Sequence, residues 1–200
     1  MSRELPILFN TEMVQAILDG KKSCTRRICK DGNEYTVPDM DFYDPEKRTY
    51  AVHNYADKEH TDKLSIAERT CPICPGDILY VRETFIQAAA HTFWYKADDK
   101  SWMSKDLLWK PSIHMPKEAA RIWLKVTDVR VERLQEISGK DLIKEGIDLF
   151  QSNYVRAAFD EFKNIWNSTI KKSDLDRYGW DASPWVWVIE FERCEKPEGV

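Results

Sequence analysis

The residues whose types can do chemistry concentrate in the stretch from 20 to 27. It reads Gly-Lys-Lys-Ser-Cys-Thr-Arg-Arg, which is four cations, two hydroxyls and a thiol without an acid, in a chain of net charge -4. A threonine hydroxyl becomes a nucleophile when a base takes its proton, and a lysine whose pKa is lowered by burial or by nearby cations can be that base. Lys22 and Thr25 are therefore candidate base and nucleophile. The alternative is a solvated basic turn or a phosphate contact.

Two glutamates are the candidate carboxylates. Glu83 shares a face with Leu79 and Val81 in a predicted strand, so it is either paired with a cation or catalytic. Glu145 ends a predicted helix, where a carboxylate is electrostatically disfavoured and needs a compensating cation or a function. The alternative for Glu145 is an ordinary surface position on the helix.

His114 lies between Pro111 and Pro116, on a loop that the prolines stiffen. It is a candidate to contact a phosphate or a base, or to pair with a buried carboxylate. The chain has no glycine-rich phosphate loop, no G-x-S-x-G and no H-E-x-x-H. These absences exclude P-loop NTPases, kinases, α/β-hydrolases and zincins.

The cysteines are five in number, and an odd count argues against a closed disulfide framework. Cys71-x-x-Cys74 is half of a zinc site, which Cys24 and Cys29 would complete. The prolines around the pair favour free thiols in a turn, so we expect no metal and no cofactor.

The composition is that of a soluble protein with a core. Hydrophobic residues make up 42% and charged residues 32% of the 200 positions. The chain contains no apolar run of the roughly 20 residues that a bilayer requires, and its first residues lack the regions of a signal peptide. We therefore expect a cytoplasmic protein with no membrane partner.

Periodicity and capping signals predict several strands and helices in mixed order. Strands are expected at 7–9, 24–28, 78–85, 121–134 and from 185, and helices at 12–19, from 138 to 145 and after a cap at Ser152. Asn10 or Thr11 can cap the first helix, and Gly20 can end it. The second helix begins with a capping box of Ser138 and Asp141. The third helix carries an apolar stripe, which consists of Val155, Phe159, Phe162 and Trp166. In the strand at 24–28, alternation separates Thr25 and Arg27 from Cys24, Arg26 and Ile28.

Two stretches interrupt this order. Residues 31–70 are rich in acids and predict an insertion with some structure of its own, and residues 87–110 read as an irregular, aromatic loop region. We predict a single α+β domain over residues 1–200, built on a small mixed barrel with flanking helices.

The motifs together resemble the ASCH domain, a relative of the PUA domain, and in particular the longer ASCH proteins of phages and prophages. The similar stretches are residues 20–27, 75–77, 81–85, 111–116, 126–134, 145–147, 179–181 and 184–187. The resemblance implies a PUA-like barrel with a cleft beside the first helix.

The smallest ASCH proteins remove the acetyl group from N(4)-acetylcytidine and carry Gly-x-Lys-x-x-Thr-x-Arg. On that pattern the resemblance implies a catalytic Lys22, a nucleophilic Thr25 and a supporting Arg27, and Glu145 is the nearest counterpart of the family's catalytic glutamate. The residues assigned to substrate contact are Lys21, Arg26, Arg27, Glu83, Ser112, His114 and Trp180, with Trp109 as a further stacking candidate.

Three functions follow as hypotheses. The first is an amidohydrolase acting on an N(4)-acylated cytosine of a nucleoside or nucleic acid. The second is a non-catalytic nucleic-acid module, for RNA rather than DNA, which uses the same cations. The third is a ribonuclease, as some ASCH proteins are reported to be, in which Glu83, Glu145 and His114 would matter most.

Overall fold

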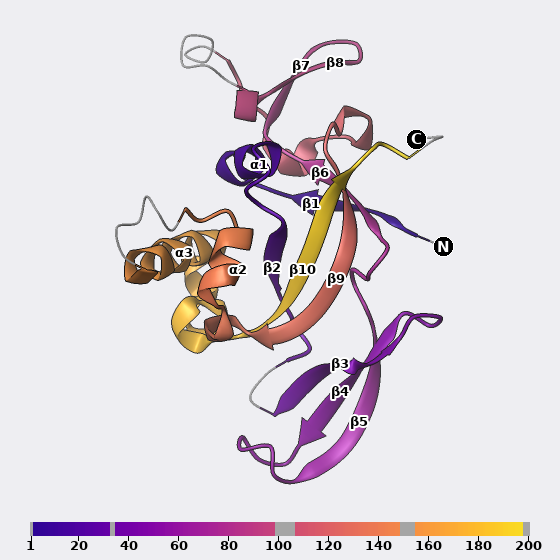
Figure 1. Ribbon diagram of the computed structural model, residues 1–200, viewed down its shortest axis with the longest axis vertical. Helices are drawn as coiled ribbons and strands as arrows, with labels where there is room; N and C mark the ends of the chain where they lie inside the picture. The colour runs from indigo at the N-terminus through magenta and orange to yellow at the C-terminus, as the bar shows by residue number, and fades with distance from the viewer. Residues whose placement is uncertain (1, 33–34, 99–106, 149–154, 198–200) are drawn as a thin grey trace. The chain divides into compact units, whose positions relative to one another are not determined.

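The computed structural model describes residues 2–32, 35–98, 107–148 and 155–197 (Figure 1). The chain forms two compact units. Unit 1 comprises Met1–Ser23, Pro75–Thr127 and Phe191–Val200, and unit 2 comprises Cys24–Cys74 and Asp128–Glu190. Two long strands, β9 (Trp123–Arg133) and β10 (Trp185–Cys194), contribute residues to both units.

Unit 1 is organised by three paired strands. β1 (Glu4–Leu8) runs parallel to β6 (Ile78–Arg82), and β6 pairs antiparallel with the start of β9. Asp77, which precedes β6, is fully buried and forms an ion pair with Arg3, with 2.9 Å between Asp77 Oδ2 and Arg3 Nη2. A buried carboxylate requires such a partner, so this pair ties the beginning of β1 to the beginning of β6.

Helix α1 (Thr11–Leu18) directly precedes the basic stretch of residues 20–27. The Asn10 side chain accepts a hydrogen bond from the Met13 amide at 2.8 Å, which confirms the predicted cap. The helix ends where Gly20 adopts a φ of +72°, a left-handed conformation that favours glycine. The sequence signals therefore predicted both ends of this helix.

The aromatic region of unit 1 is more regular than its sequence suggested. The predicted strand 78–85 breaks after Arg82, and β7 (Phe85–Ala89) and β8 (Thr92–Tyr95) then form an antiparallel hairpin. His91 has a φ of +59° in the turn between them. Three 3-10 helices follow: Lys96–Asp98, Ser112–His114 and Lys117–Ala119.

Unit 2 contains the predicted strand β2 (Cys24–Ile28), which pairs antiparallel with β10. The predicted insertion forms its own antiparallel sheet in the order β3-β4-β5, with β3 at Thr36–Asp44, β4 at Thr49–Tyr55 and β5 at Lys63–Thr70. Tyr50 of β4 is fully buried and meets the ring of Trp187 edge-on, with centroids 4.9 Å apart.

The helices of unit 2 follow β9. They are the 3-10 helix Leu134–Glu136, α2 (Gly139–Lys144), α3 (Val155–Thr169), the 3-10 helix Lys172–Asp174, α4 (Leu175–Tyr178) and the 3-10 helix Trp180–Ala182. Ser138 and Asp141 form the predicted capping box of α2. The predicted cap of α3, Ser152, lies outside the described residues.

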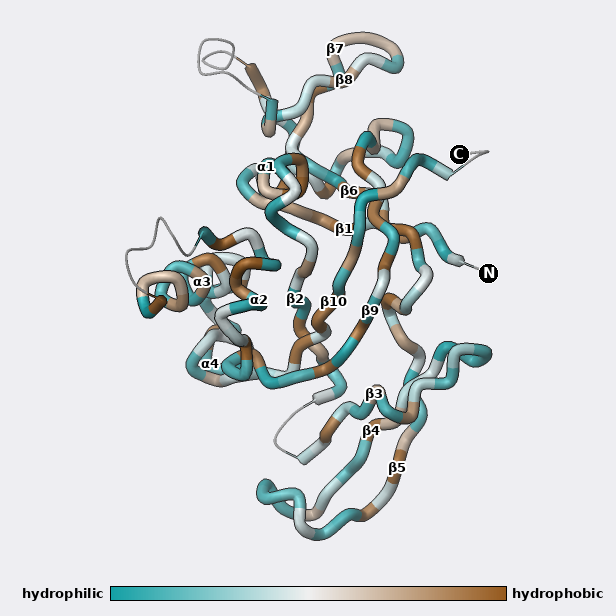
Figure 2. Tube along the Cα trace, in the orientation of Figure 1, coloured by the Kyte–Doolittle hydropathy of each residue, from teal (hydrophilic) through white to brown (hydrophobic). Residues whose placement is uncertain are grey.

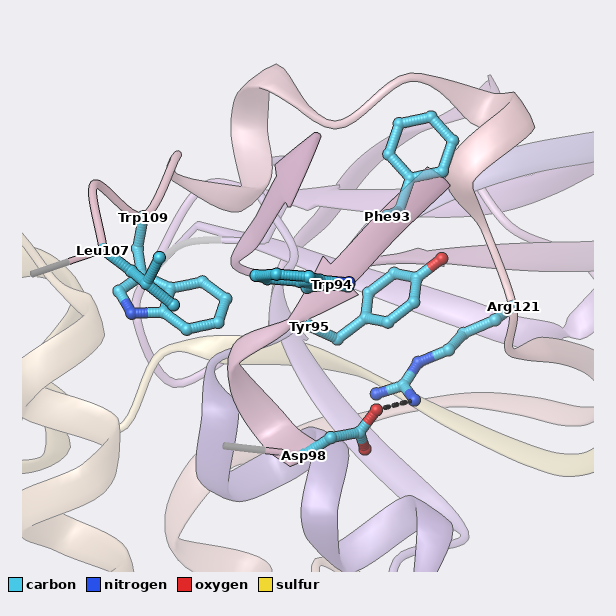
Figure 3. A pocket seen from close by; sticks show the side chains of 7 residues that line it. All are labelled: Phe93, Trp94, Tyr95, Asp98, Leu107, Trp109 and Arg121. Carbon is cyan, nitrogen blue, oxygen red and sulfur yellow. Dashed lines mark hydrogen bonds and ion pairs between the residues drawn. The ribbon is translucent and has the colours of Figure 1, made fainter. Parts of the chain in front are cut away.

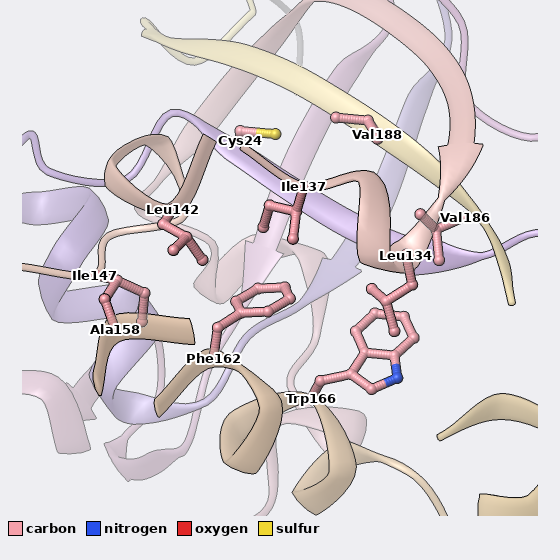
Figure 4. Packing of buried hydrophobic residues seen from close by; sticks show 10 residues of the cluster. All are labelled: Cys24, Leu134, Ile137, Leu142, Ile147, Ala158, Phe162, Trp166, Val186 and Val188. Carbon is pink, nitrogen blue, oxygen red and sulfur yellow. The ribbon is translucent and has the colours of Figure 1, made fainter. Parts of the chain in front are cut away.

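The core of unit 2 lies between these helices and the β2–β10 pair (Figure 4). α3 presents Ala158, Phe162 and Trp166 inward at helical spacing, and its tube alternates between apolar and polar colours in Figure 2. Phe162 and Trp166 belong to the predicted apolar stripe, whose other members are the partly buried Phe159 and the 58% exposed Val155. The other members of the core are Cys24, Leu134, Ile137, Leu142, Ile147, Val186 and Val188.

The fold is α+β, as the sequence predicted. The described strands form three open sheets, and the predicted closed barrel is not found among them. The hairpin β7–β8 and the sheet β3–β5 pair their strands internally instead of extending one sheet to closure. In the same described residues, no helix is long and apolar enough to cross a membrane.

The core of unit 2 provides a stability prediction. Phe162→Ala should lower the free energy of unfolding by about 3–5 kcal/mol, because it removes a large buried ring and leaves a cavity. Val155→Ala is the matched control on the same helix, since Val155 is 58% exposed. Urea unfolding measures both, and equal midpoints for the two variants would contradict this view of the core.

Candidate functional site

Strand β2 sets the direction of the residues that follow Lys22. Its register pairs Thr25 with Ile189, Arg26 with Val188 and Arg27 with Trp187 of β10. Thr25 and Arg26 are both buried. Because successive side chains point to opposite faces of a strand, Thr25 and Arg27 share one face, and Arg26 lies on the other.

Arg26 is enclosed by three carboxylates. Its Nε and Nη1 atoms donate to Glu132 Oε1 and Glu145 Oε1, each at 3.1 Å, and Nη2 lies 3.7 Å from Asp141 Oδ2. The side chain is only 1% exposed. Burial lowers the pKa of Arg26, but the charge of Glu145 and the hydrogen bond and charge of Glu132 outweigh it and raise the pKa above its ordinary value.

A second arginine extends this group of charges. Arg130 donates to Glu190 Oε1 at 2.7 Å and to Asp141 Oδ1 at 3.3 Å, and Glu190 also accepts from Lys144 Nζ at 2.9 Å. We call the whole group the ionic network; its members are Arg26, Arg130, Lys144, Glu132, Asp141, Glu145 and Glu190. It joins β2, β9, α2 and β10 within unit 2.

Glu145 is the C-terminal cap residue of α2 and is largely buried. A carboxylate at the end of a helix was expected to need a compensating cation or a function, and Arg26 is a cation paired with it. Burial lowers the pKa of Arg27, and the charge of Glu145 partly offsets this. The charge of Glu145 therefore raises the pKa of two successive arginines, Arg26 and Arg27, that point to opposite faces of β2.

The lysines before β2 belong to unit 1 and differ from each other. Lys22 is 4% exposed; its amide donates to the Ala16 carbonyl at 3.0 Å, and its ammonium lies 5.9 Å from the centroid of the Phe9 ring. Lys21 has a side chain that is 61% exposed and pairs with Asp19 at 3.4 Å. Two of the four cations of the basic stretch, Lys22 and Arg26, are thus removed from solvent, whereas Lys21 is exposed and Arg27 is half-buried.

Glu83 lies in unit 1 and is 1% exposed. Arg121 binds it with two hydrogen bonds, at 2.9 and 3.0 Å, which fits the predicted alternative of a carboxylate paired with a cation. Burial raises the pKa of Glu83, and the hydrogen bonds and charge of Arg121 oppose that rise. Sequence analysis did not identify Arg121.

The predicted contacts Ser112 and His114 form a 3-10 turn after Pro111. His114 is exposed, and its amide donates to the Pro111 carbonyl at 3.0 Å. Arg82 donates from Nε to the Met115 carbonyl at 2.7 Å and from Nη2 to the Ile113 carbonyl, so it holds the loop in place.

The predicted stacking residues lie in different units. Trp180, in unit 2, packs edge-on against Phe162 with centroids 6.0 Å apart and borders a hollow with Asp176 and Asp181. Trp109, in unit 1, lines a pocket with Trp94 and other residues of the aromatic region (Figure 3). No motif in the sequence pointed to this pocket.

The four buried cysteines are free thiols. Cys71 Sγ lies 2.9 Å from the Ile73 carbonyl, and Cys74 Sγ lies 3.6 Å from the Cys71 carbonyl. Within the part of the chain that the structure describes, no three His, Cys, Asp or Glu side chains are arranged to hold a metal ion.

Comparison of the chain with protein-family models, curated proteins and solved structures found no match.

The ionic network yields a prediction about Arg26. Arg26→Met should destabilise the protein by about 3–5 kcal/mol at pH 7, because three carboxylates lose a buried cation. The hydrogen bonds of Ser138 and the charges of Arg26 and Arg130 outweigh burial and keep the pKa of Asp141 below its usual value. That stabilisation is present above the unfolded pKa of about 4 and is lost as the pH falls through the folded pKa. The deficit of the variant should therefore shrink as the pH falls.

Urea unfolding at pH 7 and at several pH values from about 4 down to about 2 measures this change, because the loss occurs below the unfolded pKa. Lys21→Met is the matched control, since it also removes a cation from the same stretch but from an exposed pair. A deficit that stays constant or grows on acidification would show that the carboxylates do not depend on Arg26.

Proposed function

We propose that this protein is an amidohydrolase that removes the acyl group from an N(4)-acylated cytosine. Thr25 is the nucleophile, Lys22 the base, and Glu145 the carboxylate that serves the hydrolytic water. Arg27 supports the site from the face of β2 that it shares with Thr25. The fold would be of PUA type and the substrate RNA or its nucleoside, in keeping with the resemblance to ASCH domains.

The observation that carries the proposal is the burial of the motif. Lys22 and Thr25 are only three residues apart in the chain, and both are buried, as are Arg26 and Glu145. A surface that binds phosphates by charge needs exposed cations, whereas a site that performs acyl transfer gains from the exclusion of water. Burial therefore favours chemistry over electrostatic binding at this motif.

The proposed reaction proceeds in two steps. Lys22 acts as the base and accepts the Thr25 proton while the hydroxyl oxygen attacks the amide carbonyl carbon. The C–N bond to N4 breaks, and the Lys22 proton passes to the departing amine. Cytosine is released, and the acyl group remains on Thr25 as an ester. Water then attacks the ester carbonyl and gives a proton to Glu145. The bond between the acyl carbon and the Thr25 oxygen breaks, Glu145 returns the proton to that oxygen, and the carboxylic acid is released.

The environment of Glu145 favours its role in the second step. A carboxylate accepts hydrogen bonds through two oxygens, and that of Glu145 is held in place by the hydrogen bond that its Oε1 accepts from Arg26 Nη1 at 3.1 Å. Such a group is suited to orient and deprotonate a water. The proton for the departing amine is then better supplied by the Lys22 ammonium.

The other hypotheses have less support. A purely electrostatic RNA module would depend on cations of which Lys22 and Arg26 are buried. A ribonuclease built on Glu83 would use a carboxylate that already receives two hydrogen bonds from Arg121.

The proposal predicts release of cytidine from N(4)-acetylcytidine, or of the deacetylated base from an acetylated oligonucleotide. Lys22→Ala, Thr25→Ala and Glu145→Gln should each lower kcat by at least about 100-fold, the usual contribution of such groups. Thr25→Ser should retain activity, because it keeps the hydroxyl. Lys30→Ala is the control, since Lys30 is an exposed lysine outside the proposed machinery.

Chromatographic separation of substrate and product measures the turnover, and urea unfolding shows whether each variant is folded. Folded wild-type protein that releases nothing from either substrate overturns the proposal. Full activity in Thr25→Ala would instead exclude the covalent step.

A further inference from the structure

The pocket of the aromatic region in unit 1 has the construction of a ligand site. Its volume is about 260 Å³, and its lining residues are Phe93, Trp94, Tyr95, Asp98, Leu107, Trp109 and Arg121. Figure 3 shows the two indoles, the Tyr95 ring and the Asp98 carboxylate around this space. The volume is near the lower end of the roughly 300–1,000 Å³ typical of small-molecule sites, so the pocket suits a single ring system.

The aromatic walls are held in place by the rest of unit 1. Tyr95 donates its hydroxyl hydrogen to the Ala119 carbonyl at 2.7 Å, and the Arg121 guanidinium lies 4.0 Å from the centroid of its ring. The ammonium of Lys96 lies 4.9 Å from the centroid of the Trp109 ring. Trp94 remains 44% exposed. The pocket thus offers indole surface for stacking on a framework that is already positioned.

Two charged groups line the pocket, the acceptor Asp98 and the donor Arg121, and Asp98 is the more exposed of the two. Asp98 is 54% exposed, and its Oδ2 receives a hydrogen bond from Arg121 Nη1. Arg121 is in turn positioned by Glu83, which binds its Nε and Nη2. An ionised carboxylate has room for further donors but offers none of its own. A ligand ring must therefore present an N–H group to Asp98.

Flat aromatic walls together with one carboxylate match a nucleobase that carries an exocyclic amino group. Base stacking on aromatic side chains tolerates any base, and an aspartate accepts from the N4 amino group of cytosine. Uracil places the carbonyl oxygen O4 where cytosine has its amino group, and a carboxylate repels that oxygen. The one free donor of uridine's base, N3–H, lies between two carbonyl oxygens that the carboxylate also repels. The charge of Asp98 thus provides selection that stacking alone lacks.

We infer that this pocket binds an amino-bearing nucleobase, with Trp94 and Trp109 as the stacking surfaces and Asp98 as the acceptor. The choice of a nucleobase among planar rings rests on the proposed function. The base can come from a free nucleoside or from a neighbouring position in a single strand, and the chemistry of recognition is the same for both.

Isothermal titration of the full chain with cytidine, uridine and short oligocytidylate and oligouridylate strands tests this inference. Cytidine should bind more tightly than uridine. Trp109→Leu and Trp94→Leu should each weaken cytidine binding by about fivefold or more, the loss expected for one stacking surface. Phe42→Leu is the matched control, since it removes an exposed ring of unit 2 that does not line the pocket.

A further variant tests the acceptor. Asp98→Asn keeps the shape of the side chain but adds a donor, so the preference for cytidine over uridine should fall toward equality. Binding of the strand but not of cytidine would still support the pocket, provided that Trp109→Leu weakens it. Unchanged affinity in both tryptophan variants, or no binding of any of the four ligands, overturns the inference.

The experiments can refute the pocket and the proposed reaction independently of each other. Thr25→Ala should bind cytidine as the wild type does, whatever its turnover. A protein that binds cytidine through Trp109 but deacylates nothing refutes the reaction alone. A protein that deacylates, but whose Trp109→Leu variant binds cytidine normally, refutes the pocket alone.

Discussion

The buried guanidinium of Arg26 is the constraint on which unit 2 depends. A buried cation is tolerated only when carboxylates surround it with good geometry. The carboxylates come from β9, which provides Glu132, and from α2 and its cap, which provide Asp141 and Glu145. These contacts fix where α2 lies against β2. The apolar core of unit 2, which includes Leu142 and Phe162, packs against the same elements that these ion pairs join.

Much of this arrangement could be predicted from local patterns. Alternation in residues 24–28 predicted the strand with its observed bounds, and the register bears out the separation of Thr25 from Arg26. The capping box at Ser138 and the glycine stop at Gly20 are equally local, and both are confirmed. The partners of Arg26 could not be predicted, because Glu132 and Glu145 lie 106 and 119 residues away in the chain. A sequence pattern indicates that a charge needs compensation, but it does not identify the residue that compensates it.

The aromatic region shows the opposite limit. Its hairpin was missed because alternation assigned Phe85 to the preceding strand, and the break at Glu83 has no turn signal. At the break, Glu83 forms its buried pair with Arg121, a tertiary contact that no local pattern reveals. The described strands form open sheets for a related reason, since periodicity predicts where strands lie but not which strands pair. Whether the site residues act as the resemblance implies stays a prediction, because burial and ion pairing restrict the possible roles without selecting one.

Arg121 compensates a buried carboxylate in unit 1, as Arg26 does in unit 2, but the two arginines differ in exposure. Arg26 is enclosed on its carboxylate side and is 1% exposed, so its charge is used inside the protein. Arg121 binds the buried Glu83 with one part of its guanidinium and reaches the exposed Asp98 with another. The compensation of one buried carboxylate thus positions a second one at the surface of a pocket. Because Arg121 faces both carboxylates, the orientation of Asp98 depends on an arginine that the buried Glu83 holds in place. A carboxylate oriented in this way discriminates between ligands by their donors more sharply than a mobile one, since a bound ring does not have to restrict its motion.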